Sequence, residues 1–520
     1  MAHATILKMS ETQTAAIEFL ADPATYGLGA GDVKRIDTHG AVVFLAGGRV
    51  YKIKRAVKYP YLDFSTLEKR EAALRAEIEA NRRFAPELYH DVIAVTRGAN
   101  GKLALGDAGE AVEWALVMRR FDENATLDHV AERGELDDNL ARALGEAVAE
   151  AHKRSPRFDG DKWIGALGRF VGDEDTAIHA ASDLIAIADA DALGNRLRSE
   201  LARIGPLLRK RGKEGHIRRG HGDLHLRNVA RIDGKPVLFD ALEFDPVVAA
   251  GDVLYDLAFL LMDLLARDLR RAASLVFNRY LTAASCDEHL DALAAMPFFL
   301  ALRAAIRARV ALDKRELVQG KDRAEAEREA RRYVALAARL IAPARPKLIA
   351  IGGLSGTGKS TIVAALAPFV DPAPGAVHLR SDIERKRLAG VGEFDRLPPE
   401  SYTSQSSAQV YARLNELARR TAIAGHSAII DAVHARAGER DEIASVAKEA
   451  GVPFEGIWLE LPLEARIRRV GARRGDASDA DAEVARAQQD YDPGEIRWRR
   501  IDASGHPGEV VARVRGALGL

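Results

Sequence analysis

Residues 353–360 carry a pattern that suits phosphate binding. The run Gly-Leu-Ser-Gly-Thr-Gly-Lys-Ser holds two glycines five positions apart and ends in Lys359 and Ser360. In such a loop, backbone N–H groups and the start of the next helix surround the phosphates, while the lysine reaches the outer phosphates and the serine can bind Mg²⁺. We therefore predict a nucleotide site here. The expected nucleotide contacts are Gly353, Leu354, Ser355, Gly356, Thr357, Gly358, Lys359, Ser360 and Thr361, with Lys359 also catalytic and Ser360 also a metal ligand.

Two carboxylates and a group of arginines follow the phosphate loop along the chain. Asp382 comes shortly after an apolar run at residues 376–379, and Asp431 ends another run at residues 428–430. Open α/β sheets bind ligands at the carboxyl ends of their strands, so these positions suit a ligand site. Four arginines cluster around a predicted helix before residues 475–479, where they could form a mobile lid over the phosphate or simply a solvated helix face: Arg466, Arg469, Arg473 and Arg474.

Residues 347 to about 510 resemble the P-loop kinases of small molecules and of polynucleotide 5'-hydroxyl groups, including gluconate kinase-like and zeta toxin-like proteins. The resemblance implies that Asp382 is a catalytic base or substrate-positioning carboxylate. It implies that Asp431 is a magnesium-associated group and that Arg473 is a lid cation at the nucleotide. The extended second motif and the finger region usual in a motor ATPase are not recognisable.

Residues 221–240 hold a second set of candidate chemical groups. Asp223 and Asn228 are five positions apart, and Asp240 follows after a short apolar run. Kinase catalytic loops use this spacing, because one Asp must face the acceptor hydroxyl while the Asn and a later Asp hold Mg²⁺ against the nucleotide phosphates. We therefore predict Asp223 as a catalytic residue, and Asn228 and Asp240 as metal ligands.

The region around this second set, roughly residues 10–340, resembles the aminoglycoside phosphotransferase-like kinases. Gly222 stands where protein kinases commonly carry Arg, and the downstream run Gly-Asp-Val-Leu-Tyr-Asp-Leu-Ala strengthens the likeness. In this interpretation Asp252 and Asp256 brace the catalytic loop and cap a helix rather than perform chemistry. His221 is then a structural loop residue, not a metal ligand paired with the histidine four positions later.

The same resemblance assigns the nucleotide side of that site. Lys52, in an apolar run that predicts a strand, would bind the phosphates, although Lys54 on the same strand face stays open as the alternative. Glu77 would be the ion-pair partner of that lysine, with Glu71 as a weaker option. The hinge whose backbone groups would contact adenine is Val117, Met118 and Arg119.

The elements that must position these groups follow from apolar periodicity. Residues 41–45 and 50–54, joined by two glycines, predict a strand hairpin, and residues 66–84 predict a helix. Strands and helices alternate beyond residue 347, as in a layered sheet. We expect an α+β two-lobed protein-kinase-like fold followed by an α/β P-loop three-layer sandwich. The predicted domains are 1–119, a kinase-like N-lobe; 120–342, a mostly helical C-lobe with the catalytic loop; 343–346, a linker; and 347–520, a P-loop kinase domain.

Composition excludes several classes of protein. In 520 residues, 76 Lys and Arg balance 76 Asp and Glu, and 47% of the chain is apolar, which excludes a disordered chain and a polybasic coat. The single cysteine, Cys286, excludes an intramolecular disulfide and indicates a reducing compartment. The apolar run at residues 257–262 is far shorter than the roughly 20 residues of a membrane span, and the start lacks a signal-peptide pattern. We expect a cytoplasmic protein without a membrane partner.

These features lead to one leading hypothesis, a bifunctional kinase. Each module would use Mg²⁺ and ATP, or another nucleoside triphosphate, to phosphorylate a hydroxyl group of a small molecule. Two alternatives stay open: one module only binds nucleotide and regulates the other, or the chain is a nucleotide-gated scaffold for a protein partner. Nucleic acid is not favoured, although a polynucleotide acceptor for the P-loop module stays open. The sequence identifies neither the acceptors nor the oligomeric state, but a neutral or anionic acceptor of the first module is favoured by Arg303, Arg307 and Arg309.

Overall fold

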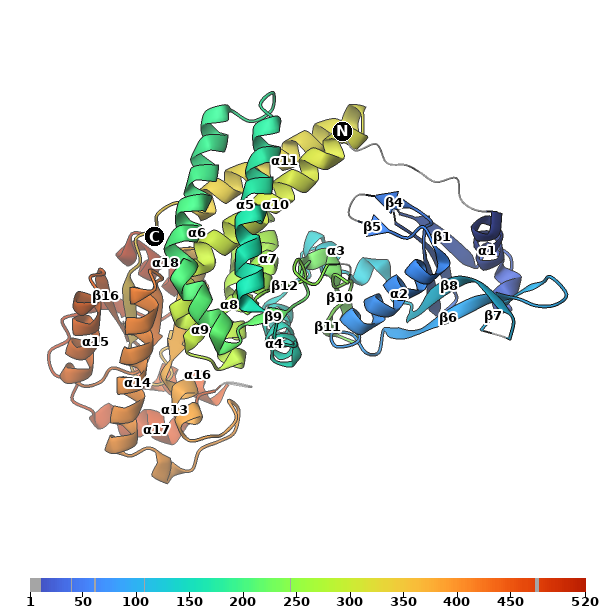
Figure 1. Cartoon of the computed structure of the whole chain (residues 1–520). Coiled ribbons are helices and arrows are strands. Elements are labelled where there is room, and N and C mark those ends of the chain that lie inside the picture. Colours follow the sequence, from blue (N-terminus) through green and yellow to red (C-terminus); the bar gives the residue numbers. More distant parts are fainter. Residues whose placement is uncertain (1–10, 39, 60–61, 107, 244, 473–476) are drawn as a thin grey trace. The chain divides into compact units, whose positions relative to one another are not determined.

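The computed structural model describes residues 11–520 apart from 39, 60–61, 107, 244 and 473–476 (Figure 1). The chain forms two compact units. The first unit is Met1–Leu167 with Leu208–Leu260, and the second is Gly168–Leu207 with Leu261–Leu520.

The points of division between the units fall inside helices. These helices are α5 (Gly160–Ala180), α6 (Ile187–Glu214) and α7 (Val253–Ala266). The domain boundaries predicted at residues 119/120 and 343–346 lie elsewhere in the chain, and they stay predictions. The units therefore do not separate the two predicted kinase modules: the last helices before residue 343 belong to the same compact unit as the P-loop region.

A six-stranded antiparallel sheet forms the N-terminal part of the first unit. Its strands in spatial order are β1 (Val33–Asp37), β2 (Ala41–Ala46), β3 (Arg49–Lys54), β8 (Glu110–Arg119), β6 (Tyr89–Arg97) and β7 (Leu103–Leu105). The predicted hairpin is confirmed, because β2 and β3 pair directly across a turn in which Gly47 has a φ of 55°. A short strand pair, β4 (Lys58–Tyr59) with β5 (Leu62–Asp63), follows β3.

Helices cover the sheet through apolar side chains. Val42 and Phe44 of β2 are fully buried in one cluster with Ile17 and Leu20 of α1 (Glu11–Ala21). A second cluster joins Leu74 of α2 (Leu67–Asn81) to Val92, Leu116 and other residues of β6 and β8. Alternate strand residues point to opposite faces of a sheet, so the two clusters lie on opposite faces.

The long helix predicted at residues 66–84 is confirmed as α2, which ends three residues earlier than predicted.

The predicted catalytic segment lies among short strands of the first unit. β10 (Val229–Ile232) and β11 (Lys235–Leu238) form a hairpin directly after Asn228. β9 (Ile217–Arg219) pairs with β12 (Ala250–Asp252), and α7 begins at the next residue. Two further helices of this unit are α3 (Leu127–Glu132) and α4 (Asp138–Arg154).

Helices fill the part of the second unit that precedes residue 343. Besides parts of α5, α6 and α7, they are α8 (Arg270–Ala284), α9 (Glu288–Asp291), α10 (Met296–Leu317) and α11 (Gly320–Leu340), with α10 and α11 packed together. Among the described residues, one segment, Glu288–Leu317, is long and apolar enough to cross a membrane by length and composition. It is 78% buried inside the structure, and the core helix of a soluble protein passes the same test.

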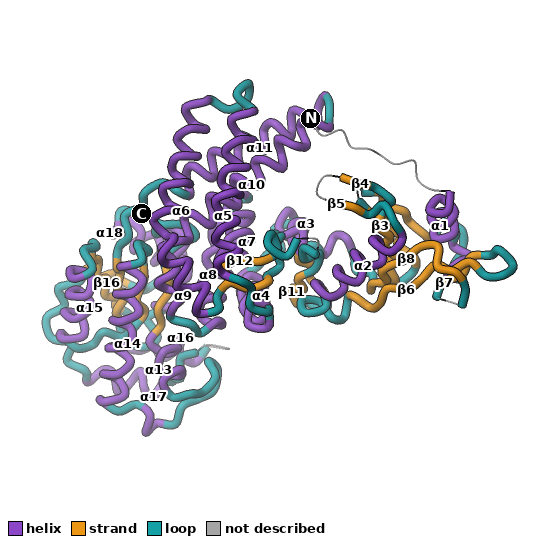
Figure 2. The backbone as a smooth tube through the Cα atoms, in the orientation of Figure 1, coloured by secondary structure: helices purple, strands orange, loops and turns teal. Residues whose placement is uncertain are grey.

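A five-stranded parallel sheet forms the rest of the second unit (Figure 2). Its strands in spatial order are β14 (Val377–Arg380), β15 (Ala428–Asp431), β13 (Leu348–Gly352), β16 (Phe454–Glu460) and β17 (Arg499–Asp502). The surrounding helices are α12 (Lys359–Leu366), α13 (Ser381–Leu388), α14 (Ser404–Ile423), α15 (Ala437–Glu449), α16 (Leu463–Gly471), α17 (Ala482–Ala487) and α18 (Pro507–Leu518).

Burial on both faces of this sheet explains its layers. Ile349 and Ile351 of β13 belong to one cluster with side chains of α12 and α18. Leu348 and Ala350 are also fully buried, and strand geometry directs them to the opposite face. Helices α14 and α15 contact β15 and β16. The predicted α/β three-layer arrangement is confirmed.

Candidate active sites

The amino group of Lys52 lies between two carboxylates in the first unit. Its Nζ is 2.7 Å from Glu77 Oε1 and 3.7 Å from Asp240 Oδ1. Burial alone would lower the pKa of Lys52, but the two carboxylates outweigh it and raise that pKa well above its ordinary value. Since the Asp240 side chain is 54% exposed, Lys52 is held as a cation where this site meets solvent.

Lys54, the alternative lysine, has a different environment. Its Nζ lies 2.8 Å from Glu77 Oε2 and 2.8 Å from Glu243 Oε1, and its side chain is only 5% exposed. Burial raises the pKa of Glu77, but the charges of the two lysines outweigh burial, so the pKa is lowered. Glu71, the weaker candidate partner, instead pairs with Arg75 at 2.8 Å. The geometry therefore directs Lys52 toward Asp240 and encloses Lys54 between carboxylates.

The position of Asp240 is fixed through its backbone. Its φ is 60°, in the left-handed region that residues other than glycine seldom adopt. The N–H of Asp240 donates to Tyr89 Oη at 3.1 Å, and the N–H of Ala241 donates to Asn81 Oδ1 at 2.8 Å. Asn81 follows Glu77 by one helical turn and donates to the Glu77 carbonyl oxygen at 3.0 Å. These bonds connect the helix of Glu77 to the backbone at Asp240.

The structure brings the predicted catalytic Asp and metal-binding Asn together. Asn228 Nδ2 donates to the carbonyl oxygen and to Oδ2 of Asp223, each at 2.9 Å. His225 Nε2 lies 3.3 Å from the same Oδ2. The N–H of Phe239, next to Asp240, donates to the Asn228 carbonyl oxygen at 2.9 Å. Because Asn228 directs its amide nitrogen to Asp223, its amide oxygen is the atom that a cation would meet.

Asp256 braces the catalytic loop, as predicted. Its two carboxylate oxygens accept the N–H groups of His221 and Gly222, each at 2.9 Å. His152 Nε2 lies 3.0 Å from Asp256 Oδ2. Burial lowers the pKa of His221, whose Nε2 lies 2.9 Å from the Phe239 carbonyl oxygen. The loop is therefore held by a side chain of α7.

Asp252 has the structural role that the sequence predicted. Its buried carboxylate accepts from Arg211 Nε at 2.5 Å and from Arg211 Nη2 at 2.8 Å. It also accepts the N–H of Leu254 in the first turn of α7 at 2.9 Å. A two-bond pair between guanidinium and carboxylate fixes both position and orientation.

Val117 and Met118, the predicted hinge residues, lie inside β8. Val117 pairs with Tyr51 of β3 and Asp91 of β6, so its strand has neighbours on both sides. The chain leaves the sheet after Arg119. A cavity of about 420 Å³ is found at that exit, lined by Lys34, Gly48, Arg120, Phe121, Asp122, Glu123 and Asn124. Contact between adenine and Val117 or Met118 stays a prediction.

The phosphate loop of the second unit has a backbone that requires glycine. Gly353, Gly356 and Gly358 have φ values of 136°, 90° and 92°. A Cβ atom on Gly356 would lie 2.6 Å from the Arg466 carbonyl oxygen, so the loop and α16 approach closely. Helix α12 begins at Lys359, whose Nζ donates to the Gly353 carbonyl oxygen at 2.8 Å. A glycine loop that runs into a helix N-terminus suits bound phosphate.

The loop opens into a cavity of about 1340 Å³. The predicted residues Lys359, Ser360, Asp382 and Asp431 line this one cavity, so the structure brings the loop and both carboxylates together. Of the other predicted loop contacts, Ser355, Gly356, Gly358 and Thr361 also line it. Gly353 and Thr357 are buried, and Thr357 Oγ1 donates to the Leu354 carbonyl oxygen at 2.9 Å.

Asp431 is a buried carboxylate surrounded by cations and imidazole. His378 Nε2 lies 3.0 Å from its Oδ2, and Arg380 Nε lies 3.6 Å from the same atom. Burial raises the pKa of Asp431, but His378, Arg380 and Lys359 outweigh burial and lower it. Asp431 therefore stays ionised beside the phosphate loop. An ionised carboxylate is a ligand type that Mg²⁺ prefers.

Arg466 and Arg469, the two described members of the predicted arginine cluster, form neither a solvated face nor a free lid. Arg466 is 1% exposed and donates to the Ala485 carbonyl oxygen at 3.3 Å. Arg469 donates to the carbonyl oxygens of Thr357 at 3.2 Å and Ala503 at 2.9 Å. Arg469 therefore connects the phosphate loop to the segment after β17, and Arg466 connects α16 to α17. The predicted lid cation Arg473 lies outside the described residues.

Several residues of the second cavity were missed by the sequence analysis. Arg385, three positions after Asp382, lines the cavity and lies 4.9 Å from the Tyr402 ring centroid. Asp479 accepts from Tyr402 Oη at 2.6 Å and from Lys386 Nζ at 3.1 Å. Only the spacing of Arg385 behind Asp382 on one helix could have signalled any of these. Also missed were the cavity-lining Arg436 and Gln488, whose Oε1 accepts from Ser355 N–H at 2.7 Å.

The arginines expected to favour a neutral or anionic acceptor are occupied by the protein itself. Arg307 Nη2 lies 3.6 Å from Glu329, and Arg309 Nη1 lies 3.3 Å from Glu174. Arg303 is buried. Because these cations are shielded or paired with carboxylates, they give no support for an anionic acceptor.

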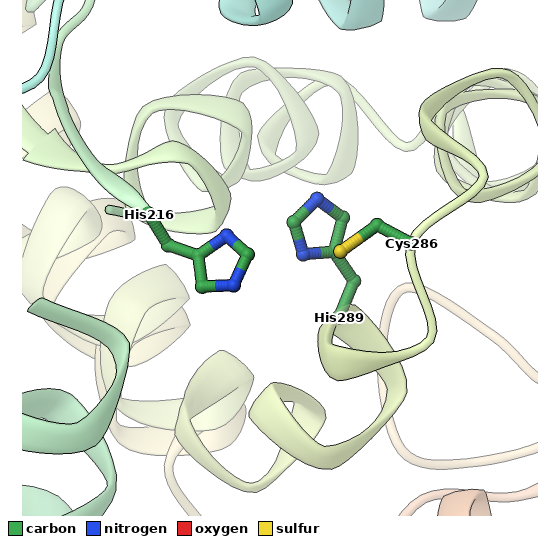
Figure 3. A group of neighbouring side chains, drawn as sticks. All are labelled: His216, Cys286 and His289. Atoms are coloured by element: carbon green, nitrogen blue, oxygen red, sulfur yellow. The ribbon is translucent and has the colours of Figure 1, made fainter. Parts of the chain in front are cut away.

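Cys286 lies in the connection between α8 and α9 and is half-buried. Its Sγ donates to Glu288 Oε2 at 3.0 Å. Figure 3 shows Cys286 beside His289. The sulfur of Cys286 and a ring nitrogen of His289 lie within 4.8 Å of each other, and both residues belong to the second unit. His216, also labelled there, belongs to the first unit.

Two family models match different parts of the chain. The model described as "Phosphotransferase enzyme family" matches residues 61–296, and the model described as "AAA domain" matches residues 348–493. Uncharacterized proteins of Mycobacterium tuberculosis and Mycobacterium bovis are 30% identical over 481 residues, covering 90% of this chain and 92% of theirs. The chain belongs to the same family as these mycobacterial proteins. The family models and the two sheet topologies confirm a kinase-like phosphotransferase domain followed by a nucleotide-binding, P-loop kinase-like domain.

Shorter and more distant likenesses concern the separate modules. The adenylyl-sulfate kinase of Myxococcus xanthus is 32% identical over 118 residues, which is 22% of this chain and 59% of that kinase. A solved choline/ethanolamine kinase family protein from Mesorhizobium loti covers 63% of this chain and 99% of its own, with a TM-score of 0.36 and 15% identity. A gluconokinase from Sinorhizobium meliloti covers 34% of this chain and 98% of its own, with a TM-score of 0.25 and 21% identity.

Proposed function

We propose that this chain is a magnesium-dependent phosphotransferase in which both modules transfer the γ-phosphoryl group of ATP, or of another nucleoside triphosphate, to a hydroxyl group of a small molecule. The observation that carries the proposal is the assembled set in the first unit. Lys52 bridges Glu77 and Asp240, while Asn228 and Asp223 are joined by two bonds of 2.9 Å. Such positioning supplies most of the catalysis in phosphoryl transfer.

The donor groups in the first unit fit a magnesium-bound nucleotide. The half-exposed carboxylate of Asp240 and the amide oxygen of Asn228 are hard oxygen ligands of the kind that Mg²⁺ prefers. When bound, the ion neutralises charge on the phosphates. Lys52 binds phosphate oxygens as a cation, and Asp223 orients the acceptor hydroxyl and accepts its proton. Asp256 keeps the loop of Asp223 in place through two backbone N–H groups.

The second unit offers the same functions with different parts. Gly353, Gly356 and Gly358 leave room for phosphate along the loop, and Lys359 and Ser360 stand at the start of α12. Ser360 and the ionised Asp431 would hold Mg²⁺. Asp382, which lines the same cavity, would orient the acceptor hydroxyl. Arg473 keeps its predicted role as a lid cation.

One alternative keeps a single catalytic module, with the other binding nucleotide as a regulator. A second alternative makes the chain a nucleotide-gated scaffold for a protein partner. The presence of both complete residue sets supports two catalytic modules instead, because a pure binding module has no need for an acceptor-facing carboxylate. We further propose that the acceptors are small molecules, that nucleic acid and membrane are not partners, and that the protein is cytoplasmic.

A metabolite screen tests this function. The full chain is incubated with Mg²⁺, ATP and a pool of metabolites, and phosphorylated products are identified by mass spectrometry. We expect products that disappear with Asp223→Asn and different products that disappear with Lys359→Ala. Products lost with only one variant would indicate a single catalytic module. Nucleotide binding without any phosphorylated product would contradict the proposal and favour the scaffold.

A further inference from the structure

Helix α8 is joined to the edge strand of the P-loop sheet by one side chain. Asn278 Oδ1 accepts the N–H of His378 at 2.7 Å, and Asn278 Nδ2 donates to the carbonyl oxygen of Ala376 at 3.1 Å. β14 is an edge strand, so its outer N–H and C=O groups have no neighbouring strand to pair with. The amide of Asn278 therefore takes the place of a neighbouring strand at this one point.

The contact extends to the helix that carries Asp382. Arg387 of α13 donates to the Thr282 carbonyl oxygen of α8 at 2.6 Å and to Glu384 Oε1 at 2.6 Å. Arg413 of α14 donates to Glu384 Oε2 at 3.2 Å and makes two bonds of 2.5 Å to Asp287. Glu384, whose side chain is 4% exposed, is thus held from both sides two residues after Asp382.

Further pairs close the same contact. Arg420 of α14 makes bonds of 2.9 and 2.6 Å to the carboxylate of Asp291 in α9, and Arg279 of α8 pairs with Glu393. Between these charged groups, the fully buried ring of Phe277 lies 5.6 Å from the ring of His426. A buried ring contact with charged pairs around it matches the apolar core and polar rim of packed interfaces.

Both ends of this contact lead to the candidate site. The backbone N–H of His378 donates to Asn278, and the His378 ring lies 3.0 Å from Asp431, the carboxylate proposed to hold Mg²⁺. Strand β14 ends at Arg380, and the next helix begins with Ser381 and Asp382. A shift of β14 or α13 would therefore move Asp382, and the His378 ring that contacts Asp431 at the end of β15, relative to the phosphate loop. Displacements of about 1 Å can cost two orders of magnitude in rate.

We propose that α8 and α9, which lie within the segment matched by the phosphotransferase-family model, are a structural part of the P-loop active site, with Asn278 as a positioning residue for Asp382 and Asp431. The inference rests on the proposed phosphoryl transfer by the P-loop module. In this arrangement the P-loop site is complete only with two helices, α8 and α9, of the phosphotransferase-family segment. The positions of the two carboxylates depend on Asn278, whereas the phosphate loop at residues 353–361, which binds the nucleotide, does not.

The test compares Asn278→Ala with the matched control Asn195→Ala, an exposed position on α6, in the full chain. ATP turnover with water as acceptor and binding of a fluorescent ATP analogue are measured in an Asp223→Asn background, which isolates the P-loop module. We expect Asn278→Ala to lower kcat at least tenfold while the Kd of the analogue changes less than twofold. We also expect amide exchange in residues 377–388 to rise at least tenfold, with residues 353–361 unchanged.

Three outcomes separate the possibilities. If Lys359→Ala leaves this turnover intact, the proposed function of the P-loop module fails, whatever Asn278 does. If Lys359→Ala removes the turnover but Asn278→Ala matches Asn195→Ala in both kcat and amide exchange, the positioning role is overturned. A joint loss of kcat, analogue affinity and thermal stability would also overturn it, because that pattern indicates general unfolding. Exchange at residues 377–388 reports on the contact even where turnover is slow.

Discussion

Lys52 and Lys54 share one carboxylate: Glu77 holds Lys52 through Oε1 at 2.7 Å and Lys54 through Oε2 at 2.8 Å. The two lysines then diverge, because Lys52 continues toward Asp240 and Lys54 toward Glu243. One carboxylate thus orients a phosphate-binding cation and anchors a buried structural cation. The two functions can be separated by mutation.

Lys52→Ala should lower activity, whereas Lys54→Met should lower stability. Lys52→Ala removes a cation from the phosphates, so we expect phosphoryl transfer by the first module to fall by about 10²–10³ with little change in stability. Lys54→Met leaves Glu243 without its buried partner, so we expect a loss of about 3 kcal/mol of unfolding free energy with nucleotide binding retained. Phosphoryl-transfer assays and urea unfolding of both variants check these expectations. Loss of transfer with Lys54→Met and loss of stability with Lys52→Ala would instead make Lys54 the phosphate-binding lysine.

Asp256→Asn should weaken the catalytic loop. Asn offers one carbonyl oxygen where the carboxylate offers two, so one of the N–H groups of His221 and Gly222 loses its acceptor. We expect a loss of about 1–3 kcal/mol and a fall in kcat of the first module larger than the rise in KM for nucleotide. The exposed Asp268→Asn is the matched control. Unchanged kcat with lowered stability would limit Asp256 to a folding role.

Acid should destabilise the P-loop part of the chain through His434. Burial lowers the pKa of His434 to about 3, whereas an unfolded histidine has a pKa near 6.5. Between these two pKa values, His434 is protonated in the unfolded chain but neutral in the folded chain. The free energy of unfolding therefore falls as pH drops from about 6.5 toward 3. At pH 5 the loss from this one group is about 2 kcal/mol.

The variant His434→Asn should reduce this pH dependence. Asn removes the titrating ring and tolerates the φ of 51° at this position. The ring of Trp498 lies 5.1 Å from that of His434, so tryptophan fluorescence during urea unfolding at pH 7 and pH 5 reports on the site. His506→Asn, which replaces one helix cap by another, is the control. An equal drop in stability for His434→Asn and wild type would contradict the assignment.

Tyr402→Phe should loosen the contact between Tyr402 and Asp479, which both line the second cavity. Its hydroxyl donates to Asp479 at 2.6 Å, while Lys386 continues to hold the same carboxylate. We expect nucleotide to dissociate several-fold faster, with stability changed by about 1 kcal/mol or less. Tyr491→Phe changes another cavity-lining tyrosine and serves as control. Stopped-flow measurement of the nucleotide dissociation rate checks this expectation. Equal rates for the two variants would show that the Tyr402–Asp479 bond has no part in retaining nucleotide.

The sequence could predict those parts of the sites that are encoded by local spacing. Asp223 and Asn228 meet because a loop of fixed length joins them. Gly353, Gly356 and Gly358 can adopt the positive φ values of the phosphate loop because they lack a Cβ atom. Such features need no knowledge of distant residues. The central strand β13 is likewise encoded locally, since its run Leu-Ile-Ala-Ile-Gly is buried on both faces.

Contacts between distant residues could not be predicted in this way. Lys52 and Lys54 are equivalent by strand periodicity, and distant carboxylates distinguish them: Asp240 beside Lys52, and Glu243, 189 positions away, beside Lys54. Asn278 is one polar residue in an amphipathic helix, and its partner His378 lies 100 positions away. The edge strand β17 was missed because its residues Arg-Arg-Ile-Asp are mostly exposed and show no apolar run.

The most direct test of two active sites in one chain is transfer of labelled phosphate from [γ-³²P]ATP to a metabolite pool by wild type, Asp223→Asn, Lys359→Ala and the double variant. Two separate sites predict that each single variant loses its own labelled products and keeps those of the other, and that the double variant labels nothing. Labelled products that persist in the double variant, or single variants that each keep every product, would contradict the account.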